Sequence, residues 1–176
     1  MLGNTYAGQD CSIARALEVL GERWTLLVLR DALYGVRRFS DFAEHLDIPR
    51  AVLTDRLRKL VTHGLLTRTT AGGDGGGAVS YELTEAGRAT WPVVHALARW
   101  GEAWAPGPAG RAPRLFCHAR CGTRLDPAGW CPACKVTPEV ADVITSKQVL
   151  PSAPRRTDRV AEVLAGQQPH RMLAPI

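Results

Sequence analysis

Apolar residues recur every three or four positions through residues 12–34, which is the spacing of amphipathic helices. The pattern predicts a first helix that Ser12 caps and Gly21 ends, because a hydroxyl side chain and a glycine are favoured at those two positions. It predicts a second helix that begins near Trp24 and stops at Gly35. Two amphipathic helices are therefore expected at the start of the chain.

Residues 39–64 have the pattern of two short helices separated by a tight break. Ser40 is positioned to cap the first helix. The break falls at Pro49, because the residue before a proline is driven out of the helical region of backbone space. Gly64 is positioned to end the second helix. Two short helices joined by about three residues predict a helix-turn-helix.

Two β-prone runs follow the second of these helices, "LLTRTT" at residues 65–70 and "AVSYELT" at 78–84. The segment between them, "AGGDGGG", has the glycines that a hairpin turn requires. A helix-turn-helix followed directly by a hairpin predicts a winged helix. The expected fold is mainly α-helical, with a small β-hairpin as the wing.

A further helix is predicted after Thr84, with Pro92 kinking or restarting it. Its three tryptophans, Trp91, Trp100 and Trp104, give a terminal helix an unusually large apolar surface. They could pack on their own domain or form the interface of a dimer. We favour the dimer, because no further domain is expected to cover them.

Changes in composition mark the domain boundaries. The stretch "APGPAGRAP" has the composition of a linker and separates the helical region from a group of cysteines. The predicted organisation is an N-terminal arm (1–10), a winged-helix domain (11–104), a linker (105–114), a zinc-binding module (115–146) and a basic tail (147–176). The tail is expected to be mobile, because no core is available to it.

The 176 residues suit one average domain or two small ones. No apolar run reaches the roughly 18 to 20 residues that span a bilayer, so no membrane association is expected. The N-terminus lacks the pattern of a secretory signal. We therefore expect a cytoplasmic protein, in which structural disulfides are rare.

The net charge of +5 comes from two basic stretches, residues 49–68 of the predicted helix-turn-helix and wing and the last thirty residues. Residues 49–68 carry five Lys or Arg side chains against Asp55 alone. A local excess of positive charge of this kind is typical of a surface that binds a polyanion such as double-stranded DNA.

The second helix of the motif presents side chains that suit base recognition, provided that its leucines are buried. Arg58 could bind guanine through two hydrogen bonds, Thr54 could contact base edges or a thymine methyl, and Asp55 could accept from cytosine. The basic residues around them are candidates for contacts with the DNA backbone: Arg37, Arg38, Arg50, Arg56, Lys59 and Arg68. Arg68 is the candidate on the wing, because the glycine-rich tip offers only an Asp.

Three segments resemble the HxlR-type winged-helix transcriptional regulators, a branch of the MarR-like group: "CSIARALEVLGERWTLLVLRDALYGVRRFSDF", "IPRAVLTDRLRKLVTHGLLTR" and "YELTEAGRATWPVVHALARWGEAW". The resemblance runs from Cys11 to Trp104, over half of the chain. It implies a homodimer that binds operator DNA, with a major-groove helix at 49–63 and a wing at 66–83. Members commonly repress a neighbouring gene or their own, so a repressor is expected.

Cys11 matches a position that is a redox-reactive thiol in some members of this family. A helix N-terminus is one environment that makes a thiol reactive. A half-buried cysteine that only packs is the more common case. The signal that such a regulator answers to would be a small molecule or a redox change.

The segment "FCHARCGTRLDPAGWCPACK" holds four of the five cysteines. The pairs Cys117-x3-Cys121 and Cys131-x2-Cys134 have the spacing of a small zinc ribbon, in which four ligands close a tetrahedral structural site. His118-x2-Cys121 is an equally good half-site. One structural Zn²⁺ per chain is therefore expected on Cys121, Cys131 and Cys134 with either Cys117 or His118. The softness of sulfur slightly favours Cys117, and the family resemblance favours His118.

The same module argues against an enzyme. Cys131-x-x-Cys134 resembles a thioredoxin site, but the "KVTPE" that follows opposes the helix such a site needs. His118 lacks the His-x-Glu pattern of a zinc deaminase. Two functions remain, a sequence-specific transcriptional regulator and, as the alternative, a protein-interaction module without sequence-specific DNA binding. The basic helix favours the regulator.

Overall fold

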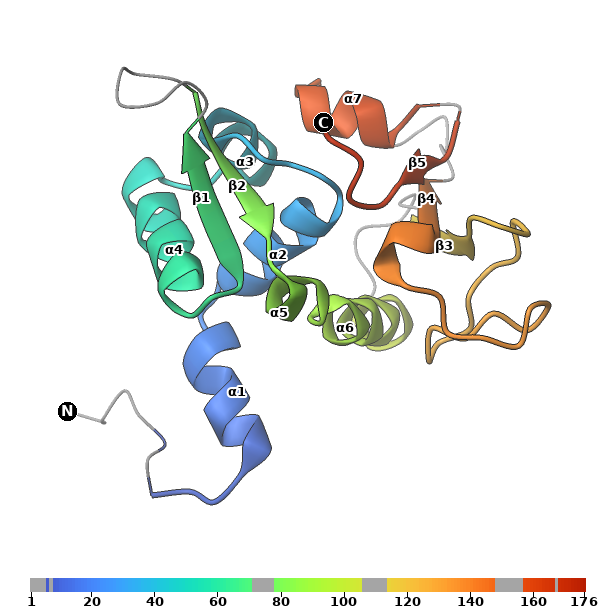
Figure 1. The fold of residues 1–176 in the computed structure, drawn as a ribbon, viewed down its shortest axis with the longest axis horizontal. Coiled ribbons are helices and arrows are strands. Elements are labelled where there is room, and N and C mark those ends of the chain that lie inside the picture. The colour runs from blue at the N-terminus through green and yellow to red at the C-terminus, as the bar shows by residue number, and fades with distance from the viewer. Residues whose placement is uncertain (1–5, 7, 71–77, 106–113, 148–156, 167) are drawn as a thin grey trace.

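The computed structural model describes residues 6, 8–70, 78–105, 114–147, 157–166 and 168–176 (Figure 1). Four helices form its N-terminal part: α1 (Ser12–Leu20), α2 (Thr25–Leu33), α3 (Phe39–Leu46) and α4 (Arg50–Thr62). The tight break between α3 and α4 is confirmed. The helix-turn-helix of the sequence analysis is therefore α3 and α4.

Two predicted helix caps are wrong. The N-cap of α1 is Cys11 and the N-cap of α3 is Arg38, both with extended backbone, so each helix starts at or before the predicted serine. The hydroxyls have other partners: Ser12 accepts from Arg15 at 3.0 Å, and Ser40 donates to Asp41 at 3.1 Å. Local side-chain contacts of this kind compete with capping.

The wing is the antiparallel pair β1 (Leu66–Thr70) and β2 (Val79–Leu83). A short segment before α3 extends it on the other side, because Arg38 bridges to Ser80 and the Tyr81 amide donates to the Arg37 carbonyl at 2.9 Å. The predicted glycine-rich tip at 71–77 lies outside the described residues.

The prediction for the following helix is confirmed. The Thr84 hydroxyl caps a short helix, α5 (Glu85–Arg88), by accepting from the Gly87 amide at 3.1 Å. The chain then restarts as α6 (Trp91–Trp104), with Pro92 in the first turn, where a proline is tolerated.

The C-terminal part adds a second sheet, with the strand order β3-β4-β5 and antiparallel pairing throughout. Its elements are β3 (Arg114–His118), the 3₁₀ turn η2 (Val140–Asp142), β4 (Val143–Lys147), α7 (Arg159–Leu164) and β5 (His170–Arg171). In Figure 1 this sheet lies beside α6, and α7 lies near α3.

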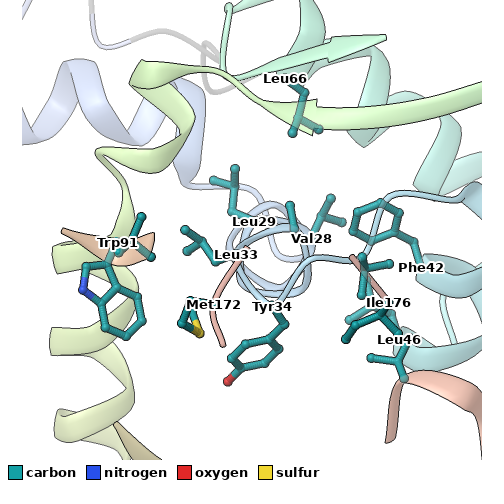
Figure 2. Close-up of a cluster of buried hydrophobic side chains, with 14 of the residues drawn as sticks. Val28, Leu29, Leu33, Tyr34, Phe42, Leu46, Leu66, Trp91, Met172 and Ile176 are labelled. Atoms are coloured by element: carbon teal, nitrogen blue, oxygen red, sulfur yellow. The ribbon is translucent and has the colours of Figure 1, made fainter. Parts of the chain in front are cut away.

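The prediction of a mobile tail is wrong for the described part of residues 147–176. Val160, Leu164, Met172 and Ile176 are all buried in the same core as the residues of α2. Figure 2 shows Met172 and Ile176 beside the side chains of α2 and α3. The tail lacks a core of its own, but the winged helix supplies one.

The C-terminal module also shares that core. The Phe116 ring on β3 lies against Trp91 and His95 of α6, with ring centroids 5.0 and 5.4 Å apart respectively. All three side chains are buried. The described residues contain no helix long and apolar enough to cross a membrane.

Candidate nucleic-acid interface and metal centre

Helix α4 has one buried and one exposed face. Leu53, Leu57 and Leu60 are 0–1% exposed and fix the helix on the core, as predicted. The opposite face carries Thr54 and Arg58, which are exposed. A helix held in this way by its leucines can enter a DNA groove without losing its packing.

The two candidate contacts at the start of α4 interact with neighbouring groups. The Thr54 hydroxyl donates to the Arg50 carbonyl at 2.9 Å, which leaves its oxygen lone pair and its methyl group for a base. The Arg50 guanidinium lies over the Phe39 ring, 5.8 Å from the centroid. This cation–π contact joins the start of α4 to the start of α3.

Within the described part of the chain, two arginines of α4 form ion pairs, and Arg58 is the more exposed of them. Its side chain is 73% accessible. Its Nη2 atom lies 2.5 Å from Asp55 Oδ1. This hydrogen bond, with a second from Lys59, lowers the pKa of Asp55. Asp55 therefore holds neighbouring cations in the free protein rather than presenting an open acceptor to cytosine.

Arg56 does not take the outward position that a phosphate contact requires. Its side chain is only 12% exposed, and its Nη1 atom lies 2.5 Å from Glu22 Oε2 in the turn between α1 and α2. Lys59 also reaches Glu22, at 2.7 Å, but keeps 47% of its side chain exposed. Hydrogen bonds from Arg56 and then Lys59 lower the pKa of Glu22. Glu22 is a site residue that the sequence reasoning missed, because no local spacing links it to α4.

The basic residues outside α4 lie on or beside the wing. Arg37 pairs with Glu82 of β2 at 2.8 Å, which reduces its availability for a phosphate. Arg38, beside the start of α3, and Arg68, on β1 opposite Tyr81, are both exposed. Exposed guanidinium groups therefore occur on α4, before α3 and on the wing.

Apolar side chains are exposed on α1 and α6. The large ones are Ile13, Leu17, Val93, Leu97, Trp100 and Trp104, with 45–76% of each accessible. Trp91 was predicted to share this surface, but it is 5% exposed because it packs on Phe116. Of the three tryptophans, Trp91 is thus buried, while Trp100 and Trp104 remain on the surface.

One His/Cys cluster that could hold a metal ion is found among the described residues. Its ligand atoms come from His118, Cys121, Cys131 and Cys134, and all lie within 4.8 Å of one another. The Cys121 sulfur lies 3.6 Å from His118 Nδ1 and 3.5 Å from the Cys131 sulfur. No disulfide links these residues. Three thiols and an imidazole are thus gathered around one point.

The two halves of the cluster have the same backbone design. Gly122 and Lys135, which each follow a half-site, have positive φ angles of 69° and 55°. Each donates its amide to the carbonyl of the first residue in its half-site at 2.8 Å, Gly122 to His118 and Lys135 to Cys131. These tight turns bring the two side chains of each half-site to the same side.

Cys117 lies outside this cluster, so the slight preference for Cys117 over His118 is not supported. The two residues are adjacent on β3, and adjacent side chains of a strand point to opposite faces. His118 is 6% exposed. Burial raises the pKa of the Cys117 thiol, which makes it a poorer source of thiolate.

The thiols of the cluster are electrostatically unequal. Hydrogen bonds with Thr123 lower the pKa of Cys121 to about 6, and a hydrogen bond with Cys121 raises the pKa of Cys134 to about 11. A metal ion would remove this asymmetry, because it binds each sulfur as a thiolate.

The possible redox residue, Cys11, lies at the start of α1. It is the N-cap residue, partly exposed, and is not in a disulfide. In sequence it is far from the His/Cys cluster. It directly precedes α1, the helix that exposes Ile13 and Leu17.

Comparison with known proteins gives the family. The model described as HxlR-like helix-turn-helix matches residues 19–108, more than half of the chain. The protein belongs to the HxlR-like family. The match covers α2 to α6, which are the elements that form the helix-turn-helix, the wing and the exposed tryptophans.

Relatives of this HxlR-like protein are named as regulators of transcription and not as enzymes. The HTH-type transcriptional regulator Rv3095 of Mycobacterium tuberculosis is 41% identical over 150 residues, which is 85% of this chain and 89% of its own. The HTH-type transcriptional regulator sll1512 of Synechocystis is 35% identical over 98 residues, 55% of this chain and 72% of its own. The segment that matches Rv3095 is longer than the winged-helix domain, so it includes part of the C-terminal region.

A solved structure supports the fold. The crystal structure of PA1607 superimposes with a TM-score of 0.60 and 35% identity, covering 67% of this chain and 81% of that one. The fold shared with PA1607 thus covers about two thirds of this chain.

Proposed function

We propose that this HxlR-like protein is a homodimeric, sequence-specific DNA-binding repressor, with α4 as its recognition helix. The observation that carries the proposal is the exposed polar face of α4, fixed in place by three buried leucines. Exposed Arg38 and Arg68 extend the basic surface from this face to the wing. A basic helix beside a basic wing is suited to a DNA groove and its flanking phosphates.

The proposed roles differ among the basic residues. Arg58 reads a base, since its guanidinium is exposed and can exchange Asp55 for the two acceptors of a guanine. Thr54 lies near it and contacts a base edge or methyl. Arg38, Arg50 and Arg68 bind phosphates. Arg56 stays with Glu22 and stabilises the helix rather than contacting DNA.

A homodimer through α1 and α6 explains the exposed apolar side chains there. Single exposed apolar residues are ordinary, but several large ones on two helices mark an interaction surface. Two recognition helices related by a two-fold axis would then read the two halves of a palindromic operator. The surface would bury Trp100 and Trp104 against a second copy.

The proposed cofactor is one structural Zn²⁺ per chain, held by His118, Cys121, Cys131 and Cys134. The donor set fits zinc: sulfur and nitrogen ligands in a closed group of four are typical of structural zinc sites, while oxygen-preferring cations would find no carboxylate in the cluster. Zinc would hold the two half-sites together and so stabilise the module.

The proposed signal is redox or a small molecule, with Cys11 as the redox candidate. Its partial exposure at the start of α1 makes it accessible to an oxidant in the monomer. It also lies on the helix proposed to form the dimer, so a change there could alter the spacing of the recognition helices.

The alternative is a protein-interaction module that does not bind DNA in a sequence-specific way. A titration of the purified protein with DNA from its own upstream region distinguishes the two. We expect tight binding whose affinity falls steeply as salt rises, because phosphate contacts release counterions. Equal affinity for random DNA of the same length, or no binding to either, would contradict the proposed function.

A further inference from the structure

The His/Cys cluster is connected to the C-terminal sheet through its histidine. His118 is the last residue of β3 and pairs with Val143 at the start of β4. The next amide, that of Ala119, donates to the Asp142 carbonyl at 2.7 Å. Any change that loosens His118 therefore acts on the start of β4.

The same end of β4 holds the last segment of the chain. The Arg171 guanidinium donates to the Ala141 carbonyl and to Asp142 Oδ1, each at 2.7 Å. The Met172 amide donates to the Val143 carbonyl at 2.9 Å. One short stretch, residues 141–143, is thus bonded on one side to the metal half-site and on the other to the C-terminal segment.

The C-terminal segment in turn is seated on the end of α2. The Leu173 amide donates to the Leu33 carbonyl at 2.9 Å, and the Ile176 amide donates to the Gly35 carbonyl at 3.2 Å. A Cβ atom at position 35 would lie 1.8 Å from the Ala174 carbonyl oxygen, so the approach is as close as a glycine permits. The segment occupies the turn that leads from α2 into the helix-turn-helix.

Helix α7 makes a second contact with the same region. Its Val160 and Leu164 side chains are buried, and it packs on α3, the first helix of the helix-turn-helix. At its start Arg159 approaches Asp41 Oδ2 at 3.8 Å, and the described part of the chain offers that buried oxygen no hydrogen-bond donor. The C-terminal residues therefore hold both the turn before α3 and α3 itself.

We propose that metal loading of the His/Cys cluster sets the affinity of the protein for its operator, through residues 141–143 and the C-terminal segment. The inference rests on the zinc site and the DNA binding proposed above. Metal binding to a small module supplies its folding free energy, so loss of the ion loosens β3 and the start of β4. Arg171 and Met172 then lose their partners in residues 141–143, so the rest of the C-terminal segment is held less firmly on the end of α2 and α3 is held less firmly against α2. The loaded protein is the high-affinity state.

The test uses the full chain, loaded with zinc chloride or stripped with a chelator under reducing conditions. Two quantities are measured in both states, the affinity for the upstream DNA fragment and the hydrogen-exchange protection of the Leu173 and Ile176 amides. Zinc should raise the affinity by between about 5- and 150-fold, the usual range of coupling between two sites. It should also slow exchange of both amides, because their hydrogen bonds to Leu33 and Gly35 hold only while the C-terminal segment stays seated at the end of α2.

Arg171→Gln tests the connection without changing a proposed ligand or DNA contact. It should bind zinc with unchanged stoichiometry, while the ratio of loaded to stripped affinity falls toward one. Arg124→Gln is the matched control, an exposed arginine of the same module that makes none of these contacts, and it should keep the full ratio. Circular dichroism confirms that both variants are folded.

The outcomes separate this inference from the proposed function. Zinc that binds without changing either affinity or exchange would overturn the inference and leave the repressor intact. Exchange that changes in a protein that binds no DNA would refute the repressor but support the connection from metal to α2. Protein that takes up no zinc would refute the metal site and the inference together.

Discussion

Arg56 of α4 lies 2.5 Å from Glu22, which belongs to the turn between α1 and α2. Lys59 reaches the same carboxylate at 2.7 Å. Two cations from one exposed helix are thus fixed to a single anion on a neighbouring element. These two ion pairs stabilise the middle of α4 on one side, and the buried leucines fix the helix on the other.

Glu22→Gln should destabilise the protein by about 1 kcal/mol, because Glu22 is half-exposed and solvent screens the pair, while Arg56 is left with a weaker partner. Urea denaturation measures the loss. Glu139→Gln, at an exposed position of the C-terminal module, is the control and should change little. Preserved stability in Glu22→Gln would show that these ion pairs contribute nothing.

The contribution of Glu22 should also depend on pH. Arg56 and Lys59 lower its pKa below the usual 4.5, so the folded state binds the proton more weakly than the unfolded state. Stability from the pair is then present above pH 4.5 and is lost as the pH falls through the lowered pKa. The difference in urea midpoint between wild type and Glu22→Gln should therefore disappear on acidification. A difference that grows in acid would contradict the assignment.

Arg58→Ala should weaken operator binding by roughly 1–3 kcal/mol and relax the preference at one base pair. The exposed guanidinium is expected to bind a base edge that no other side chain replaces. Arg38→Ala, a phosphate contact by our proposal, should instead weaken binding to all sequences alike and reduce the salt dependence. Competition titrations with single-base operator variants measure both effects. An equal loss on random DNA in Arg58→Ala would exclude base reading.

Local patterns predicted the helix-turn-helix and the wing, because leucine spacing, a proline break and a glycine-rich turn each act within a few residues. The inward position of Arg56 could not be predicted in this way. Its partner Glu22 lies two helices earlier, and an arginine looks the same in sequence whether it pairs with a carboxylate or a phosphate. The burial of Trp91 could not be predicted for the same reason, since its partner Phe116 lies on β3 of the C-terminal sheet.

The C-terminal region was predicted in part. The spacing of the cysteines located the cluster, but it left the choice between Cys117 and His118 open. The direction of β3 decides that choice, because adjacent residues of a strand face opposite sides. The tail was predicted to be mobile because no core was expected to be available to it. Met172 and Ile176 are buried by a surface of α2 that the tail sequence does not reveal.

Leu97→Glu should convert the proposed dimer to monomers at micromolar concentration. The side chain is 50% exposed on the apolar face of α6, and an unpaired charge buried there costs about 2 kcal/mol or more. Sedimentation velocity measures the change. Val136→Glu, which adds the same charge to an exposed apolar site on the C-terminal module, should leave the dimer unchanged. A wild-type protein that is monomeric at these concentrations would remove the basis of the proposal.

Mild peroxide should modify Cys11 and lower operator affinity, provided that this thiol is a sensor. Alkylation followed by mass spectrometry identifies the oxidised residue, and Cys11→Ser should make DNA binding insensitive to peroxide. Cys117→Ser is the control, because Cys117 lies outside both the helix interface and the metal cluster. An unmodified Cys11 together with unchanged operator binding would leave it as a packing residue.

His118→Ala should reduce zinc affinity by at least about tenfold, whereas Cys117→Ser should retain one zinc per chain. The reason is geometric: His118 Nδ1 faces the Cys121 sulfur at 3.6 Å, while Cys117 is absent from the group of four ligand atoms. Elemental analysis gives the stoichiometry, and competition with a chromophoric chelator gives the affinity. Chelation should also lower the thermal midpoint of the wild type and of Cys117→Ser alike, because the ion supplies folding free energy to the module. Loss of zinc in Cys117→Ser with retention in His118→Ala would reverse the assignment of the fourth ligand.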